Sequence, residues 1–269
     1  MNPDLITSTL SQLHAVERYA STSEQHAALE NSRLTLHFIM GRGDTGAFSD
    51  YLKNFNTHLP PVLSFATKEE ADTWLRNHPA PPHGATIGAA GARYSLSYLR
   101  ELDHRKLLRL PSEEEYARME EAGEETEEEA AEEVLSPPHP SHGTRFSFFD
   151  FFNWTCFHLY EMEKRMSSPE ELEAMRAAKI AFNFVMEVGE YHGFEEYRET
   201  VHSSRTSSPL QSFANQGEAD AWLAKQPEPP PPEVVAIGNE LYSVGYNRLR
   251  ALRVLIRIPT PQELNTGAP

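Results

Sequence analysis

Histidine and cysteine are the residue types from which a metal or nucleophilic site would be built, and the chain has twelve histidines and one cysteine. No histidine pair has the His-Glu-x-x-His spacing of a zinc-binding helix. His139 and His142 lie in a proline-rich stretch that does not hold ligand geometry. The lone Cys156 cannot form an intrachain disulfide, and its Phe- and Trp-rich surroundings favour a packed thiol. We predict no metal site and no cofactor.

The carboxylates and glycines also lack a catalytic pattern. His37 lies in a helical stretch and aligns with Asn183, so we interpret it as a satisfied helical histidine rather than a base. The glycines near Gly41 and Gly88 lack the phosphate-binding fingerprint, and no Gly-x-Ser-x-Gly elbow occurs. We therefore predict no catalytic residues. An enzyme with an unrecognised site between the two halves of the chain stays the alternative.

The chain carries one stretch twice. Residues 65–115 align without a gap with residues 213–263, at a constant offset of 148 positions, and the helical stretches before them align at an offset of 146. We predict two tandem repeats, at 1–112 and 145–269, separated by an acidic and Pro-rich linker at 113–144. Identical pairs include Trp74/Trp222, Tyr94/Tyr242, Tyr98/Tyr246, Arg105/Arg253, Arg109/Arg257, Phe38/Phe184, Phe48/Phe194 and Tyr51/Tyr197.

Each repeat is expected to position its residues on an α+β fold, with two to three helices followed by a small β-α-β-β-β unit, mostly antiparallel. Thr67 and Glu70 have the spacing of a capping box, and Asn215 and Glu218 stand at the matching positions. In the last strand, Arg253 to Ile258, alternation predicts Val254, Ile256 and Ile258 inward and Arg253, Leu255 and Arg257 outward.

The net charge of −16 is concentrated in one segment. Between Ser112 and Val134 there are twelve Glu and one Arg, in a stretch that is either a solvated helix or disordered. An acidic chain binds nucleic acid and anionic membranes poorly, whereas it suits a basic protein partner. No apolar run is long enough to span a membrane, and the N-terminus lacks the basic start of a signal peptide, which predicts a cytoplasmic protein.

Aromatic and arginine residues of the duplicated strands are the candidate binding residues, because Tyr, Trp and Arg dominate interface hot spots. The alternative is a core or strand-face role, which the retention of these residues in both copies favours. The divergent segments, including the Phe-rich helix after Phe146, are the other expected contact sites. The partner-binding candidates are Tyr94, Tyr98, Arg105, Arg109, Tyr242, Tyr246, Arg253 and Arg257.

The order Glu-Ala-Asp-x-Trp-Leu, Pro-x-Pro-Pro, Tyr-Ser-(Leu/Val)-x-Tyr and Arg-x-Leu-(Leu/Ile)-Arg-(Leu/Ile)-Pro resembles a paralogous family of duplicated myxobacterial proteins, some of which look like immunity partners of polymorphic toxins. The resemblance carries no catalytic residue. The leading hypothesis is a non-catalytic module that binds one cognate protein or peptide, either as an immunity protein or as a peptide-binding accessory protein. A basic partner, a homo-oligomer and an assembly scaffold stay open.

Overall fold

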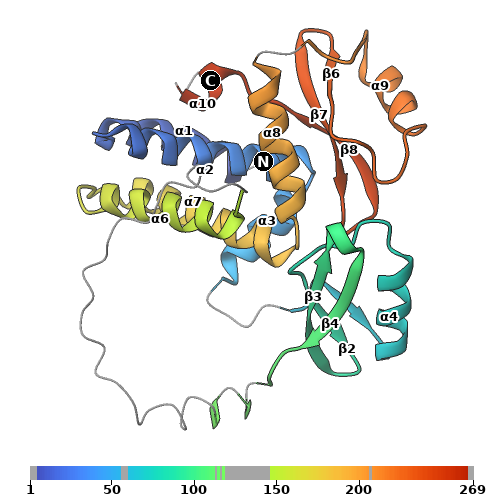
Figure 1. Cartoon of the computed structure of the whole chain (residues 1–269). Helices are drawn as coiled ribbons and strands as arrows, with labels where there is room; N and C mark the ends of the chain where they lie inside the picture. Colours follow the sequence, from blue (N-terminus) through green and yellow to red (C-terminus); the bar gives the residue numbers. More distant parts are fainter. Residues whose placement is uncertain are drawn as a thin grey trace.

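The computed structural model describes residues 5–55, 60–112, 114–115, 117–118, 146–205 and 208–265. The fold is α+β, as the sequence predicts: a body of helices lies on one side and two small β-units lie on the other, one beside the other (Figure 1). The predicted linker at 113–144 lies outside the described residues, apart from 114, 115, 117 and 118. No described helix is long and apolar enough to cross a membrane.

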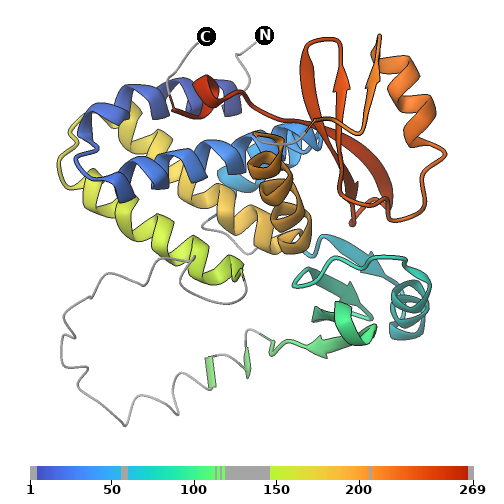
Figure 2. The ribbon, with the colours of Figure 1, turned by 45° about the horizontal axis from the view of Figure 1, so that its top comes forward.

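The helical body combines helices from both halves of the chain. Helix α1 packs against α7 and α2 packs against α6, and these contacts are more extensive than those of α1 with α2 or of α6 with α7 (Figure 2). The two halves therefore share one helical core. Its elements are α1 (Leu5–Ala15), η1 (Val16–Tyr19), α2 (Ser23–Gly41), α3 (Thr45–Lys53), α6 (Phe148–Glu163), α7 (Pro169–Glu187) and α8 (Tyr191–Ser204).

Local sequence sets the starts of these helices. The side chains of Thr22, Ser147 and Ser168 each accept a hydrogen bond from a backbone amide in the first turn of α2, α6 and α7. Pro169 occupies the first turn of α7, where a missing amide proton costs nothing. Gly43 and Gly189 follow α2 and α7 with φ of 73° and 71°, which glycine adopts without strain.

The two β-units have the same strand order. The first contains β1 (Leu63–Phe65), α4 (Lys68–Asn77), β2 (Thr86–Ala89), β3 (Ala92–Leu99), η2 (Arg100–Leu102) and β4 (His104–Arg109), and the second contains β5 (Gln211–Phe213), α9 (Gln216–Leu223), β6 (Val234–Ile237), β7 (Glu240–Asn247) and β8 (Leu252–Arg257). The sheet orders are β1-β2-β3-β4 and β5-β6-β7-β8. Every register pair of the first sheet recurs 148 positions later, as in Leu96↔Leu107 and Val244↔Leu255.

Both sheets are mixed rather than uniformly antiparallel. The first pairing of each sheet is parallel, because a helix crosses over between the two strands, and the other two pairings are antiparallel hairpins. The start of each crossover helix is capped at the predicted residues. Thr67 and Glu70 form both hydrogen bonds of the capping box, and Asn215 caps α9 through the amide of Glu218.

Hydrophobic packing separates the β-units from each other. The first unit has a core of its own, in which Tyr94, Leu96 and Tyr98 face Ala71 and Leu75 of α4. The second has a similar small core around Val244, and it also inserts Val234, Ile256 and Ile258 into the helical core. The prediction that Leu255 faces outward is wrong, because this sheet is packed on both faces and Leu255 contacts the α9 cluster.

A short helix, α10 (Pro261–Asn265), follows the last strand and packs against α2. Thr260 and Glu263 exchange capping hydrogen bonds at its start, and Ser112 and Glu115 do the same after β4. Leu264 of α10 is 1% exposed and belongs to the helical core. The division of the chain into domains stays a prediction, and the shared helical core joins its two halves.

Candidate functional site

The structure places the predicted binding residues in two separate sets, one in each β-unit. Tyr94 and Tyr98 are buried against α4. The Arg105 guanidinium donates hydrogen bonds to the carbonyls of Leu75, Arg76 and His78, which are the unpaired acceptors at the end of α4. Arg105 therefore closes the helix.

The second set has the same kinds of contact. Arg253 donates to the carbonyl of Pro227, and Arg257 pairs with Glu240 and Glu263. Further contacts are the Tyr242 hydroxyl to Glu240, the Tyr246 hydroxyl to Glu228, and, in the first set, Arg109 to Glu115. These contacts hold strands to their own unit or, through Glu263, to α10. They favour the structural interpretation of these residues. A role of the eight residues in partner binding stays a prediction.

A buried ion cluster lies where the helical body meets the two β-units. The Glu190 carboxylate is 0% exposed; it pairs with Arg42 at 2.6 Å and Arg248 at 3.2 Å, and it accepts the backbone amide of Arg248 at 2.7 Å. Arg42 also pairs with Asp44 at 2.9 Å. Burial alone would lower the pKa of Arg42, but the neighbouring Glu190 and Asp44 outweigh burial and the pKa is raised.

The cluster extends outward through three residues that are partly exposed. Glu196 pairs with Arg248 of the second unit and with Arg100 of the first, both at 2.9 Å. Arg250 pairs with Asp44 at 2.9 Å. Since each charge has an opposite partner, the cluster acts as a structural joint between the helices and both sheets.

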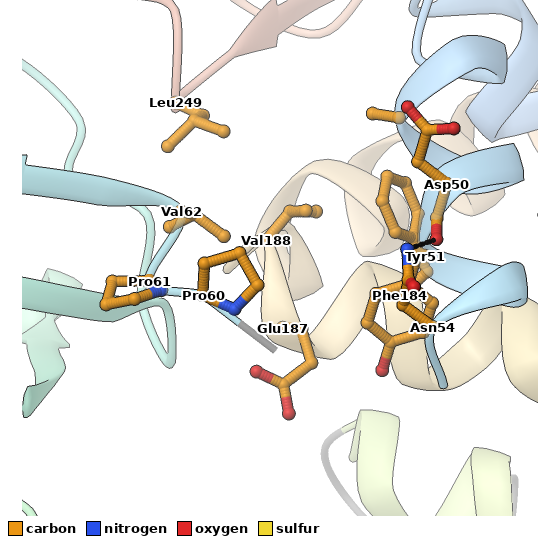
Figure 3. A pocket seen from close by; sticks show the side chains of 11 residues that line it. Asp50, Tyr51, Asn54, Pro60, Pro61, Val62, Phe184, Glu187, Val188 and Leu249 are labelled. Carbon is orange, nitrogen blue, oxygen red and sulfur yellow. Dashed lines mark hydrogen bonds between the residues drawn. The ribbon is translucent and has the colours of Figure 1, made fainter. Parts of the chain in front are cut away.

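A groove lies beside this joint and is the candidate site (Figure 3). Its volume is about 450 Å³. One wall is α3, another is the end of α7, and the segment 60–62 that leads into the first β-unit closes a third side, with Leu249 of the second unit above. The groove therefore lies between the helical body and both sheets.

The floor of the groove is aromatic. Phe184 is 4% exposed and packs edge-on against Tyr51, with ring centroids 5.4 Å apart, and against Phe48 at 5.6 Å. Val62, Val188 and the two prolines of the 60–62 segment add aliphatic surface. Burial, and then the nearby charge of Glu187, raise the pKa of Tyr51, so its phenol is neutral. A floor of this kind suits an apolar side chain.

Two carboxylates form the rim. The Asp50 side chain is 77% exposed, and within the described residues its only ion pair is to Lys53 at 3.4 Å, a surface contact. Glu187 forms no ion pair in the part of the chain that the structure describes. Among the described residues, no Lys or Arg lines the groove. A ligand that combines an apolar surface with positive charge therefore matches the groove.

A similar aromatic arrangement recurs at the positions related to the groove residues by the offset of 146. Phe38 packs against Phe194 and Tyr197, with both centroid distances 5.5 Å. That copy is covered: the Tyr197 hydroxyl donates to the Arg257 carbonyl at 2.9 Å, and β7 packs against α8. The groove is thus the uncovered copy of a surface that the second sheet occupies elsewhere in the molecule.

None of the described residues that line the groove is among the eight predicted binding residues. Tyr51/Tyr197 and Phe38/Phe184 are identical pairs, and Asp50 and Glu196 are both carboxylates at the same offset. Only the structure shows that, within its described residues, Glu196 has arginine partners and Asp50 does not.

Burial shifts the pKa of one histidine and of the lone cysteine. The described residues contain no group of three or more His, Cys, Asp or Glu that could hold a metal ion. His37 is buried, and burial lowers its pKa to about 4. Burial raises the pKa of Cys156 to about 12, which keeps its thiol protonated.

The Phe-rich helix α6 is largely core. Phe151 is 0% exposed and Trp154 is 2% exposed, whereas Phe149 and Tyr160 point outward. Comparison of the chain with protein-family models, with curated proteins and with solved structures finds no match.

Proposed function

We propose that this protein is a non-catalytic module that binds one cognate protein or peptide, and that a basic, apolar segment of the partner occupies the groove. The observation that carries the proposal is the aromatic floor beneath two rim carboxylates, Asp50 and Glu187, in a groove whose described lining contains no arginine or lysine. Apolar pockets with a few placed polar groups are the usual form of a binding site.

Charge supports the same assignment. The chain has a net charge of −16, which attracts a basic partner over long range and accelerates its association. The buried ion cluster supports it in a second way. It fixes the positions of α3, α7 and the second sheet around the groove, so the binding surface is formed before the partner arrives, which lowers the cost of association.

We also propose that the chain is an internal duplication that consists of two tandem repeats. The constant offsets of 148 and 146 positions and the equal strand orders of the two sheets support it. In this interpretation one copy uses its helical surface to hold its own sheet, and the other copy keeps the equivalent surface for a partner. An immunity-like or peptide-accessory role is compatible with such an arrangement.

The test is binding of labelled peptides, measured by fluorescence anisotropy at two salt concentrations. The panel holds peptides of about 14 residues that are basic and apolar, basic and polar, or acidic and apolar. We expect selective binding of the basic, apolar peptides, at least tenfold weaker in Asp50→Lys, which is a loss of about 1.4 kcal/mol. Glu199→Lys, an exposed change of equal charge on α8, is the matched control.

A second variant blocks access to the groove without changing its charge. Ala47 lines the groove and is exposed, so Ala47→Trp fills the mouth without disturbing the core. Binding should disappear in this variant while circular dichroism and thermal unfolding stay unchanged. Equal binding by wild-type protein and Ala47→Trp, or no peptide bound at all, would rule the groove out as the site.

A further inference from the structure

The surface around Phe38 and Tyr197, which the second sheet covers, shows which groups bind to a surface of this kind. On α8, Glu196 pairs with the Arg248 guanidinium, and the Tyr197 hydroxyl donates to the carbonyl of Arg257. Ile256 is 2% exposed and lies directly over Gly41, where an added Cβ would come within 2.6 Å of its Cγ2. The occupant thus contributes one arginine, one backbone carbonyl and one aliphatic side chain.

The groove has the receiving groups for two of these contacts. Asp50 stands where Glu196 stands, and Tyr51 stands where Tyr197 stands. The two phenol rings lie at nearly the same distance from the floor ring, 5.4 Å for Tyr51 to Phe184 and 5.5 Å for Tyr197 to Phe38. The Tyr51 hydroxyl makes no hydrogen bond within the described part of the chain.

The matching residues of the first β-unit do not fill the groove. Arg100, which aligns with Arg248, reaches Glu196 on α8 instead of Asp50. Leu108, which aligns with Ile256, is 45% exposed. The first unit is held elsewhere, since its His83 forms a β-bridge with Glu190 and its Pro82 packs against Gly189. The groove is therefore open to an outside segment.

One position differs and sharpens the expected chemistry. Glu187 replaces Gly41, so the aliphatic side chain cannot lie over that position and is displaced toward Phe184 and Val188, while a second carboxylate is added. A carboxylate beside an apolar floor favours the planar, weakly hydrated guanidinium over the strongly hydrated ammonium. Arginine can form two parallel hydrogen bonds to Asp50, and lysine cannot.

From these contacts we infer that the groove recognises an arginine-bearing aliphatic segment of a partner protein: Asp50 receives the guanidinium, the Tyr51 hydroxyl holds a backbone carbonyl, and Phe184 with Val188 receives the aliphatic side chain. The inference deepens the proposed function and rests on it. The template for the segment is the chain's own 245–258 stretch, which carries four arginines among aliphatic residues.

The experiment uses two labelled peptides and the full chain. One has the sequence of residues 245–258, and the other replaces every arginine in it by lysine, so that charge and length are equal. We expect the arginine peptide to bind at least tenfold more tightly. In Asp50→Asn this preference should fall below threefold. In Tyr51→Phe both peptides should lose affinity by about three- to tenfold, because only the hydroxyl is removed.

The outcomes separate the two proposals. Equal binding of both peptides, blocked by Ala47→Trp, overturns the arginine inference and leaves the proposed function standing. If neither peptide shows binding that Ala47→Trp blocks, both the arginine inference and the proposed function are overturned. Dimerisation of the chain that Ala47→Trp abolishes, seen by analytical ultracentrifugation, would overturn the assignment to a partner protein in favour of a second copy. A preserved arginine preference in Asp50→Asn would also overturn the inference.

Discussion

The two β-units have the same strand order and register, but they are attached to the helices in different ways. The second unit inserts Ile256, Val234 and Ile258 into the helical core. The first leaves Leu108, the residue aligned with Ile256, 45% exposed and is held by the ion cluster and the 82–84 segment. The difference shows that the same sheet arrangement can either cover a helical surface or leave it uncovered.

The strongest test of the comparison removes the joint that both units share. Glu190→Ala leaves Arg42 and Arg248 buried without their central carboxylate, which costs about 3–5 kcal/mol of unfolding free energy. Urea denaturation measures the loss. Glu199→Ala, which removes an exposed carboxylate from α8, the helix that follows Glu190, should stay within about 0.5 kcal/mol of wild type. A loss below about 1 kcal/mol for Glu190→Ala would contradict the structural role of the cluster.

A matched pair of truncations compares the two sheet faces directly. Ile256→Ala should lower the unfolding free energy by about 2–5 kcal/mol, because the side chain is 2% exposed in the helical core. Leu108→Ala should cost about 0.5 kcal/mol or less, because its side chain is half-exposed. Both values come from the same denaturation experiment. Similar losses at the two positions would mean that the first sheet face is covered in solution.

A third test concerns His37 and Asn183, which occupy aligned positions on α2 and α7. Burial lowers the folded-state pKa of His37 from 6.5 to about 4, with Glu263 opposing the shift and Arg257 and His14 adding to it. Protonation therefore favours the unfolded chain. The contribution of His37 is complete above pH 6.5 and is lost as the pH falls to 4, by about 3 kcal/mol.

The measurement is the unfolding free energy between pH 4 and 7. His37→Asn should flatten this dependence, and His104→Asn, at an exposed position on β4, should not change it. If the unfolding free energy of His37→Asn has the same pH dependence as that of wild type, His37 does not titrate with a lowered pKa in the folded chain.

The smallest expected effect is at the two helix caps. Thr67→Ala and Asn215→Ala each remove a side-chain acceptor for a first-turn amide, at a cost of about 1 kcal/mol. Because the first unit has a core of its own, we expect the Thr67 loss to appear as local opening in hydrogen exchange of α4 and the first sheet. For Asn215→Ala, we expect the faster hydrogen exchange to extend into the helical core. The same exchange pattern in both variants would remove the distinction between the units.

Much of the local structure could be predicted from the sequence, since it depends on neighbouring residues. The Thr67 capping box, the Ser168–Pro169 helix start and the alternation of Tyr94, Leu96 and Tyr98 are short-range patterns. The eight candidate binding residues lie in two separate sets, one in each β-unit. Arg105 and Arg253 each donate to a backbone carbonyl that follows the crossover helix of their own unit, a contact that is visible only in the folded chain.

The sequence by itself determined the α+β class, the helix and strand order, the capping and the concentration of negative charge, because propensity, periodicity and composition act over a few residues. The tertiary structure alone decided that α1 packs on α7 and α2 on α6, that Glu190 is buried between two arginines, and that one aromatic surface is covered while its copy is open. These depend on contacts between residues far apart in the chain, such as Glu190 and Arg248, which are 58 positions apart. Their partners are chosen by shape and charge in the assembled core rather than by local pattern.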